Sequence, residues 1–147
     1  MRLKMETDYA MRTLMILAQN NNRVVRIADV ATRLQISKNH LVKVVHRLAR
    51  YKFLDTKRGH EGGIRLGRDA GDINIGKVIR LMEQDTSLVA CFGGKTGNCN
   101  LEPDCRLKQV FARAQEQFFA TLDGFTLDAL IERNAGLAAR LKMEEVA

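Results

Sequence analysis

Two short amphipathic stretches joined by a three-residue break are the feature of this chain that most restricts its fold. In Ile27–Leu34 and again in Lys38–Tyr51, apolar residues recur at helical spacing. The break between them (QIS) ends in Ser37, a residue type that favours the first position of a helix. Two helices across so tight a turn predict a helix-turn-helix.

The second predicted helix has one apolar and one basic face. Its expected core residues are Leu41, Val44, Val45 and Leu48. Its other face carries Lys38, Asn39, His40, Lys43, His46, Arg47 and Arg50. A basic face of this kind is typical of a helix that enters the major groove of DNA, where residues near the helix start reach base edges.

Two short runs around a glycine-rich turn follow. They are Phe53–Arg58 and Ile64–Arg68, and the sequence GHEGG between them predicts a β-hairpin. The basic residues of this hairpin are Lys57, Arg58, Arg65 and Arg68. A helix-turn-helix followed by a basic hairpin predicts a winged helix. The predicted DNA contacts are Ser37, Lys38, Asn39, His40, Lys43, Arg58 and Arg65.

The charge distribution supports a division into two parts. Residues 1–70 carry 15 Lys and Arg against 6 Asp and Glu, a net charge of +9, whereas residues 71–147 carry 9 against 11, a net charge of −2. A basic half beside a near-neutral half predicts a polyanion-binding module joined to something else. We therefore predict a DNA-binding domain at 1–70, with a ligand-binding loop and dimerisation helices at 71–147.

The second part contains one long amphipathic stretch, Arg106–Leu122. Its apolar residues are Leu107, Val110, Phe111, Ala114, Phe118 and Leu122. Since helix-turn-helix repressors commonly bind as two-fold dimers, this helix predicts a homodimer on a palindromic double-stranded operator. Further helices are predicted at Thr7–Gln19, Ile73–Gln84, Thr126–Arg133 and Leu137–Met143. The expected fold is mainly α, with a small β-hairpin and a long C-terminal dimerisation helix.

All three cysteines lie in the stretch CFGGKTGNCNLEPDC, at Cys91, Cys99 and Cys105. Their spacing, with seven and then five intervening residues, lacks the close Cys-x2-Cys pair of common zinc sites. An open glycine-rich loop suits iron–sulfur ligation, because its backbone amides can bond the sulfides. Spacing alone leaves four readings open: inert thiols, a thiol switch, zinc and an iron–sulfur cluster.

No targeting or catalytic signal stands out. The apolar run Leu14–Ala18 is too short for a signal core or a membrane span, so we expect a cytoplasmic protein without a membrane partner. No nucleophile–base constellation is visible, so no enzyme is expected. An electron carrier would not need a basic wing.

Five segments carry a resemblance to a known family. They are METDYAMRTL, ISKNHLVKVVHRL, RGHEGGIRLG, DINIGKVIRLME and CRLK, and the resemblance as a whole runs from about Met1 to about Ile131. In these the chain resembles the NsrR-type regulators, bacterial winged-helix repressors that sense nitric oxide through an iron–sulfur cluster.

The resemblance implies a 4Fe-4S cluster held by Cys91, Cys99 and Cys105, with Asp8 of the partner subunit as fourth ligand. Without the resemblance, Asp8 would be read as a carboxylate favoured by the dipole at a helix start. The alternatives are an iron-responsive or cluster-supply-sensing repressor of the same fold, and a thiol-switch regulator without a cluster. The cluster-supply reading is weaker here, because no His follows His60.

Overall fold

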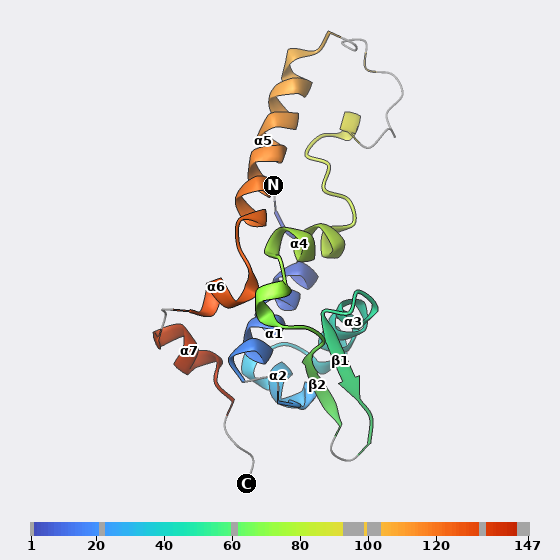
Figure 1. The fold of residues 1–147 in the computed structure, drawn as a ribbon. Coiled ribbons are helices and arrows are strands. Elements are labelled where there is room, and N and C mark those ends of the chain that lie inside the picture. The colour runs from blue at the N-terminus through green and yellow to red at the C-terminus, as the bar shows by residue number, and fades with distance from the viewer. Residues whose placement is uncertain are drawn as a thin grey trace.

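The computed structural model describes residues 2–20, 23–59, 62–92, 99, 104–132 and 135–143. They form a mainly helical fold with one two-stranded antiparallel hairpin, as predicted (Figure 1). In chain order the elements are α1 (Met5–Gln19), α2 (Ile27–Leu34), α3 (Lys38–Arg50), β1 (Leu54–Lys57), β2 (Gly63–Leu66), η1 (Ala70–Asp72), α4 (Ile75–Glu83), η2 (Ala90–Phe92), α5 (Arg106–Asp123), α6 (Leu127–Ile131) and α7 (Ala135–Leu141). Every predicted helix is present, with bounds that differ by one or two residues at most ends.

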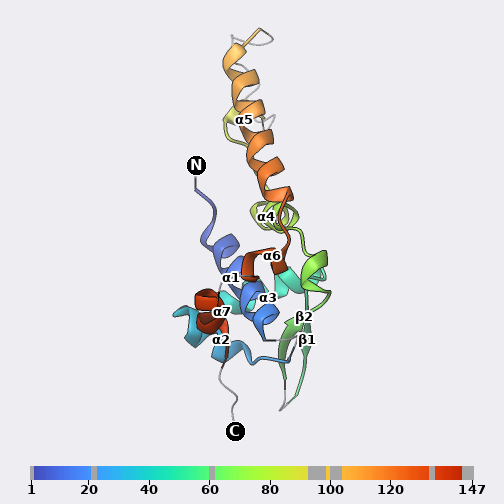
Figure 2. The ribbon, with the colours of Figure 1, turned by 60° about the vertical axis from the view of Figure 1, so that its left-hand side comes forward.

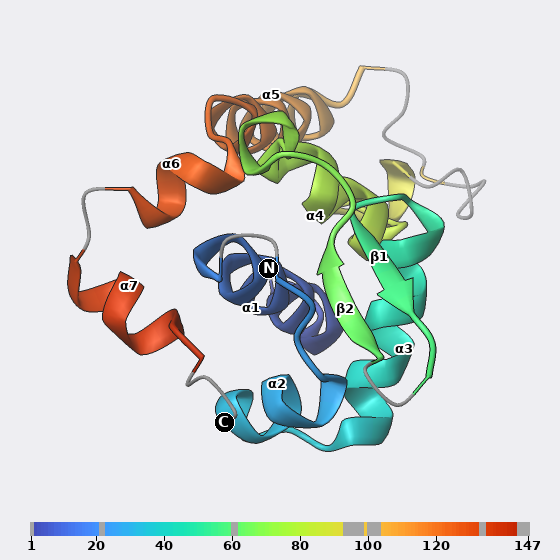
Figure 3. The same cartoon turned by 60° about the horizontal axis from the view of Figure 1, so that its bottom comes forward.

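Helix α1 lies at the centre of the fold. Figure 3 shows it surrounded by the other elements, and it contacts α2, α3, α4, β2, α6 and α7. Its residues Ala10, Leu14, Ile16 and Leu17 are fully buried. Apolar side chains on several sides of α1 are buried from water, so α1 is the element against which the others pack.

The helix-turn-helix forms as its sequence predicts. In α3 the four expected core residues, Leu41, Val44, Val45 and Leu48, are fully buried. The turn is made by Gln35, whose φ of 55° ends α2 in the left-handed region, and by Ser37, whose hydroxyl accepts the amide of His40 at 3.2 Å. This bond satisfies one of the free amides of the first helical turn, and it confirms Ser37 as the N-cap.

The hairpin is the wing. Its register pairs Leu54 with Leu66 and Lys57 with Gly63. Val25, just before α2, exchanges two 2.8 Å backbone hydrogen bonds with Ile64 and so ties the wing to the helix-turn-helix. A Cβ at Gly63 would lie only 2.4 Å from the carbonyl oxygen of Val25, so this close approach requires glycine.

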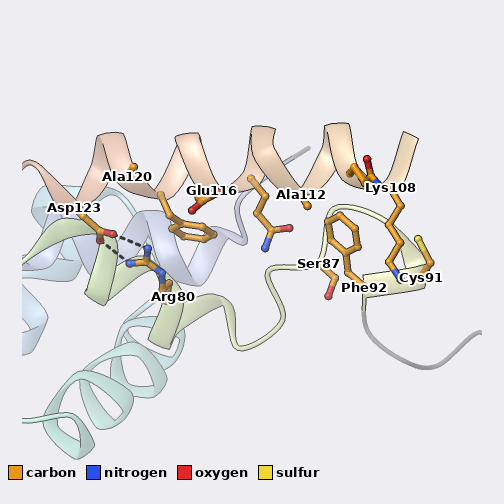
Figure 4. Close-up of a pocket in the computed structure, with 12 residues that line it drawn as sticks. Arg80, Ser87, Cys91, Phe92, Lys108, Ala112, Glu116, Ala120 and Asp123 are labelled. Carbon is orange, nitrogen blue, oxygen red and sulfur yellow. Dashed lines mark hydrogen bonds and ion pairs between the residues drawn. The ribbon is translucent and has the colours of Figure 1, made fainter. Parts of the chain in front are cut away.

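Helices α4 and α5 are joined at the base of α5 (Figure 4). Arg80 donates to both carboxylate oxygens of Asp123 at 2.6 and 2.7 Å, and its guanidinium lies 4.2 Å from the ring centroid of Phe119. Asn74 caps α4 and also donates to the Asp123 carbonyl oxygen at 2.7 Å. Gly76 leaves room for this joint, since a Cβ there would lie 2.0 Å from the Asp123 carboxylate.

From this base α5 extends away from the rest of the molecule (Figures 1 and 2). The chain then returns through α6 and α7, which both contact α1. The nearly buried Asn20, at the end of α1, accepts the amide of Met143 at 2.9 Å and donates to the Leu141 carbonyl oxygen at 3.2 Å. The segment 141–143 is thereby held on the end of α1.

The Arg80–Asp123 pair predicts a pH-dependent contribution to stability. Hydrogen bonds from Arg80 lower the pKa of the Asp123 carboxyl below its ordinary value of 3.8. A carboxyl with a depressed folded-state pKa adds stability above its unfolded pKa and loses it as the pH falls through the folded value. We therefore expect Asp123→Asn to lower the melting temperature at pH 7, with the difference from wild type narrowing as the pH falls below about 4 and disappearing only below the depressed folded-state pKa.

Thermal unfolding between pH 7 and pH 3 checks this expectation. Arg80→Met provides the matched variant, because its melting-temperature difference from wild type should narrow in the same way. The double variant should have no lower melting temperature than either single variant. A gap between wild type and Asp123→Asn that stayed constant over this pH range would contradict it.

Candidate DNA-binding surface and cysteine site

The residues predicted to contact DNA lie on two neighbouring elements. Ser37, Lys38, Asn39, His40 and Lys43 are exposed in the first turns of α3, which packs against β1. Arg58 and Arg65 are exposed on the wing. The structure therefore places all seven at the surface, on the start of one helix and the adjoining hairpin.

Arg65 already has a partner within the wing. It lies opposite Asp55 across the hairpin, and the two side chains form an ion pair at 3.6 Å. Both side chains are more than half exposed, and exposed pairs of this kind contribute little free energy. The pair therefore restrains the exposed Arg65 side chain only weakly.

Two arginines predicted on the basic surface have other roles. Arg68 lies over the ring of Phe53, 5.1 Å from its centroid, and donates to the backbone carbonyl oxygens of Tyr51 and Lys52 at 3.1 and 3.0 Å. Arg47 is bonded to α1 and α4 rather than facing solvent. The predicted solvent-facing position of Arg47 is therefore wrong, whereas Arg68 follows β2 as predicted. Both guanidiniums supply donors to backbone carbonyls at the ends of neighbouring elements, which need them.

Two of the three cysteines, Cys91 and Cys105, lie near the outer end of α5. Cys91 is half-buried in η2, Cys105 is half-buried at the N-cap of α5, and Cys99 is exposed. All three are free thiols. Most of the loop between them, 93–98 and 100–103, lies outside the described residues. Among those that are described, no three His, Cys, Asp or Glu side chains are grouped to hold a metal.

The donor set nevertheless fits an iron–sulfur cluster. Thiolates are the ligands that hold such clusters, and one loop supplies all three. Cys105 lies at a helix N-terminus, where the dipole favours negative charge.

Asp8 lies in the first turn of α1, where its carboxylate forms an ion pair with Arg12 at 2.9 Å. The Asp8 side chain is 47% exposed. A half-exposed pair between residues four apart on one helix is worth only about 0.3–0.5 kcal/mol, so a competing ligand role for this carboxylate would have little to overcome. Within one chain, the structure places Asp8 and the three cysteines on separate elements.

A cavity of about 870 Å³ runs along α5 from the Arg80–Asp123 pair towards Cys91 and Lys108 (Figure 4). It is wide open to one side, and Phe119 and Gln115 contribute to its wall. The side-chain oxygen of Gln115 is buried and has no hydrogen-bond partner among the described residues. Sequence reasoning missed Phe119, because the predicted apolar face runs through its neighbour Phe118.

Comparison with known proteins gives one family match over most of the chain. The Rrf2 family, described as an iron-dependent transcriptional regulator, matches residues 3–133. The chain belongs to the Rrf2 family. It is therefore a transcriptional regulator that binds DNA.

Among curated relatives, this Rrf2 regulator is similar to the HTH-type transcriptional regulators NsrR. It is 46% identical to that of Bacillus licheniformis over 89% of this chain and 92% of the relative. It is 41% identical to that of Bacillus subtilis over 99% of this chain and the whole of the relative. The predicted NsrR-type character is confirmed by these matches.

Solved structures confirm the fold. The chain superposes on the global cysteine regulator CymR of B. subtilis with a TM-score of 0.72, at 22% identity, over 88% of this chain and 95% of that one. The match to T. potens IscR has a TM-score of 0.72 at 20% identity, over 99% of this chain and 93% of that one. This Rrf2 chain therefore has the winged-helix fold of those structures. No helix in the described ranges is long and apolar enough to span a bilayer.

Proposed function

We propose that this Rrf2 regulator is a repressor whose operator affinity is set by a 4Fe-4S cluster that reacts with nitric oxide. The observation that carries the proposal is the sequence similarity to NsrR regulators, 46% and 41% identity over 89% and 99% of this chain. The chain also has its three cysteines in one loop. The iron-dependent description of the family supports an iron cofactor.

DNA binding in this proposal relies on α3 and the wing. Helix α3 enters the major groove, where Asn39 and His40 read base edges, while Lys38, Lys43, Arg58 and Arg65 contact phosphates. Ser37 fixes the start of α3 through its bond to the His40 amide. A homodimer would set two such helices about 34–36 Å apart, to meet successive major grooves of a palindromic operator.

The cluster ligands would be the thiolates of Cys91, Cys99 and Cys105, with Asp8 of the partner subunit as the fourth. A carboxylate is a harder and more replaceable ligand for iron than a thiolate, so the Asp8 position would be the point at which nitric oxide reacts most readily. Without that ligand role the carboxylate of Asp8 would be free to pair with Arg12, as it does in this structure, and the first turn of α1 would have no link to the other subunit. Since α1 packs against α3, this change would weaken operator binding.

The test is anaerobic purification followed by a nitric-oxide titration. Absorbance, iron and sulfide content, and mobility shift of a DNA duplex are read in parallel. The expected result is a coloured protein that contains iron and sulfide and releases DNA as nitric oxide is added. A colourless zinc-loaded protein, or a colourless protein whose DNA release follows disulfide formation, would overturn the cluster proposal. Release on iron depletion but not with nitric oxide would favour an iron-responsive repressor.

The DNA surface gives a separate prediction. Lys43 is exposed on α3, so Lys43→Ala should remove a phosphate contact and lower the slope of log affinity against log salt by about one unit. Lys77→Ala is the matched control, since Lys77 is an equally charged exposed residue on α4. Binding measured by fluorescence anisotropy between about 50 and 200 mM salt checks it. Equal slopes for the two variants would show that the wrong surface has been assigned.

A further inference from the structure

Arg47 joins α3, the helix that we propose enters the major groove, to two other helices. It lies on α3, its side chain is only 23% exposed, and its guanidinium forms an ion pair with Glu6 of α1 at 2.9 Å. The same group donates to the carbonyl oxygens of Met82 and Leu81, at 2.6 and 3.2 Å, in the last turn of α4. One side chain thus bonds to α1 and α4 at the same time.

The contacts with α4 replace bonds that the helix cannot make itself. The last four carbonyls of an α-helix have no amide partner within the helix, and a cation beside them is favoured by the dipole. Arg47 caps two of these carbonyls from another helix. The planar fork of a guanidinium suits this geometry, because it presents several N–H groups in fixed directions.

The elements that Arg47 binds are those that flank the proposed cluster ligands. Glu6 is two residues before Asp8 in the first turn of α1. Met82 precedes Glu83, a nearly buried residue whose carboxylate accepts the Thr7 hydroxyl at 2.5 Å and the Lys4 amide at 2.9 Å. The chain then runs from the end of α4 towards Cys91. The start of α1 and the end of α4 are therefore bonded to each other as well as to Arg47.

On its own helix, Arg47 lies one turn from Lys43. Because both residues lie on one continuous α-helix, a displacement at Arg47 would also move the exposed residues that begin α3. We infer that Arg47 is a positioning residue, which links the orientation of α3 to the placement of the first turn of α1 and the last turn of α4. As a regulatory role, this inference rests on the proposed function. A change at Asp8 or Cys91 would reach the DNA surface through the three bonds of one guanidinium.

The test compares operator affinity in two states of the wild type and of Arg47→Met, which keeps an unbranched apolar stem but has no donors. The probe is a DNA duplex selected by the wild-type protein from a random-sequence pool. Affinity is measured for the metal-free protein and after anaerobic reconstitution with iron and sulfide. Couplings between sites typically change affinity by about 5- to 150-fold. The affinity ratio is the DNA affinity of the reconstituted protein divided by that of the metal-free protein. We expect this ratio to lie in the 5- to 150-fold range for the wild type and below about threefold for Arg47→Met.

A second readout does not depend on the loaded protein. In metal-free Arg47→Met, amide hydrogen exchange should be faster in the last turn of α4 and the first turn of α1 than in the wild type. Both turns lose their hydrogen bonds to the Arg47 guanidinium. Arg47→Lys keeps the charge beside Glu6 but not the fork, so its affinity ratio should be intermediate. This variant, together with Glu6→Gln, carries the test if Arg47→Met does not fold.

Arg33→Met is the matched control. Arg33, on α2, also binds backbone carbonyls of another segment, those of Arg140 and Lys142, but that segment is α7 and its end. Its loss should leave the affinity ratio at the wild-type value. A folded Arg47→Met protein with the wild-type ratio would overturn the inference, and so would an equal loss of the ratio in Arg33→Met. Equal DNA affinities of the metal-free and the reconstituted wild type would instead overturn the proposed function, and the inference with it.

Discussion

Replacing Val110 with glutamate is expected to turn a dimer into a monomer without disturbing the fold of the chain. Val110 and Leu107 on α5 are each 61% exposed, although both are large apolar residues. In the homodimer that we propose, these residues would lie in the seam with the second copy of the chain. Burying an unpaired carboxylate in that seam costs several kcal/mol per ion, so the dimer should weaken by about a hundredfold or more.

Sedimentation at several micromolar concentrations measures this effect, and circular dichroism checks the fold. Val110 is a better position than Phe111 or Phe118, because those two rings are partly buried within the subunit. Gln109→Glu adds the same charge on a different face of α5 and should leave the dimer intact. If the wild-type protein itself sediments as a monomer at these concentrations, the assigned seam is wrong.

Replacing any one of Cys91, Cys99 and Cys105 with serine should remove most of the iron from anaerobically purified protein. Loss of even a residue that only supports a metal ligand commonly lowers metal affinity by about 10- to 100-fold, so loss of a thiolate ligand should reduce iron retention at least as much. Absorbance together with iron and sulfide assay provides the measurement. DNA affinity should then no longer change when nitric oxide is added.

Asp8→Ala is the informative companion, because it should be milder. Water or a thiol from the buffer can occupy the vacated position, so the colour should persist while the response to nitric oxide changes in rate or in DNA release. If Asp8→Ala follows the wild type in both readouts, Asp8 is an ordinary partner of Arg12 at a helix start. Retention of iron by all three serine variants would mean that the thiols do not hold it.

The helices and the wing were predictable, because their signals are local. The apolar spacing in α3 alone identifies Leu41, Val44, Val45 and Leu48 as core, and the structure buries all four. The turn residues around Ser37 specify where that helix begins. In α5 the same pattern indicates a long amphipathic helix but misses Phe119, whose ring is covered by the Arg80 guanidinium from α4.

The roles of the arginines were not predictable from local pattern. Arg47 binds carbonyls 34 and 35 residues away, and Arg68 binds carbonyls 16 and 17 residues away, so their partners appear only when the chain is folded. The cysteines were found from spacing and residue type. A fourth ligand from another subunit leaves no trace in spacing, and only the resemblance suggested Asp8.

The bonds between Asn20 and residues 141–143 have a consequence for synthesis on the ribosome. Asn20 and Met143 are 123 residues apart, which at roughly 5–20 residues per second separates their synthesis by about 6 to 25 s. During that interval the end of α1 has no cover from α7, and its buried amide is open to water or to other chains. The end of the central helix is thus enclosed only once residues 141–143 have been made, whereas α2, α3 and β2 can pack against α1 well before then.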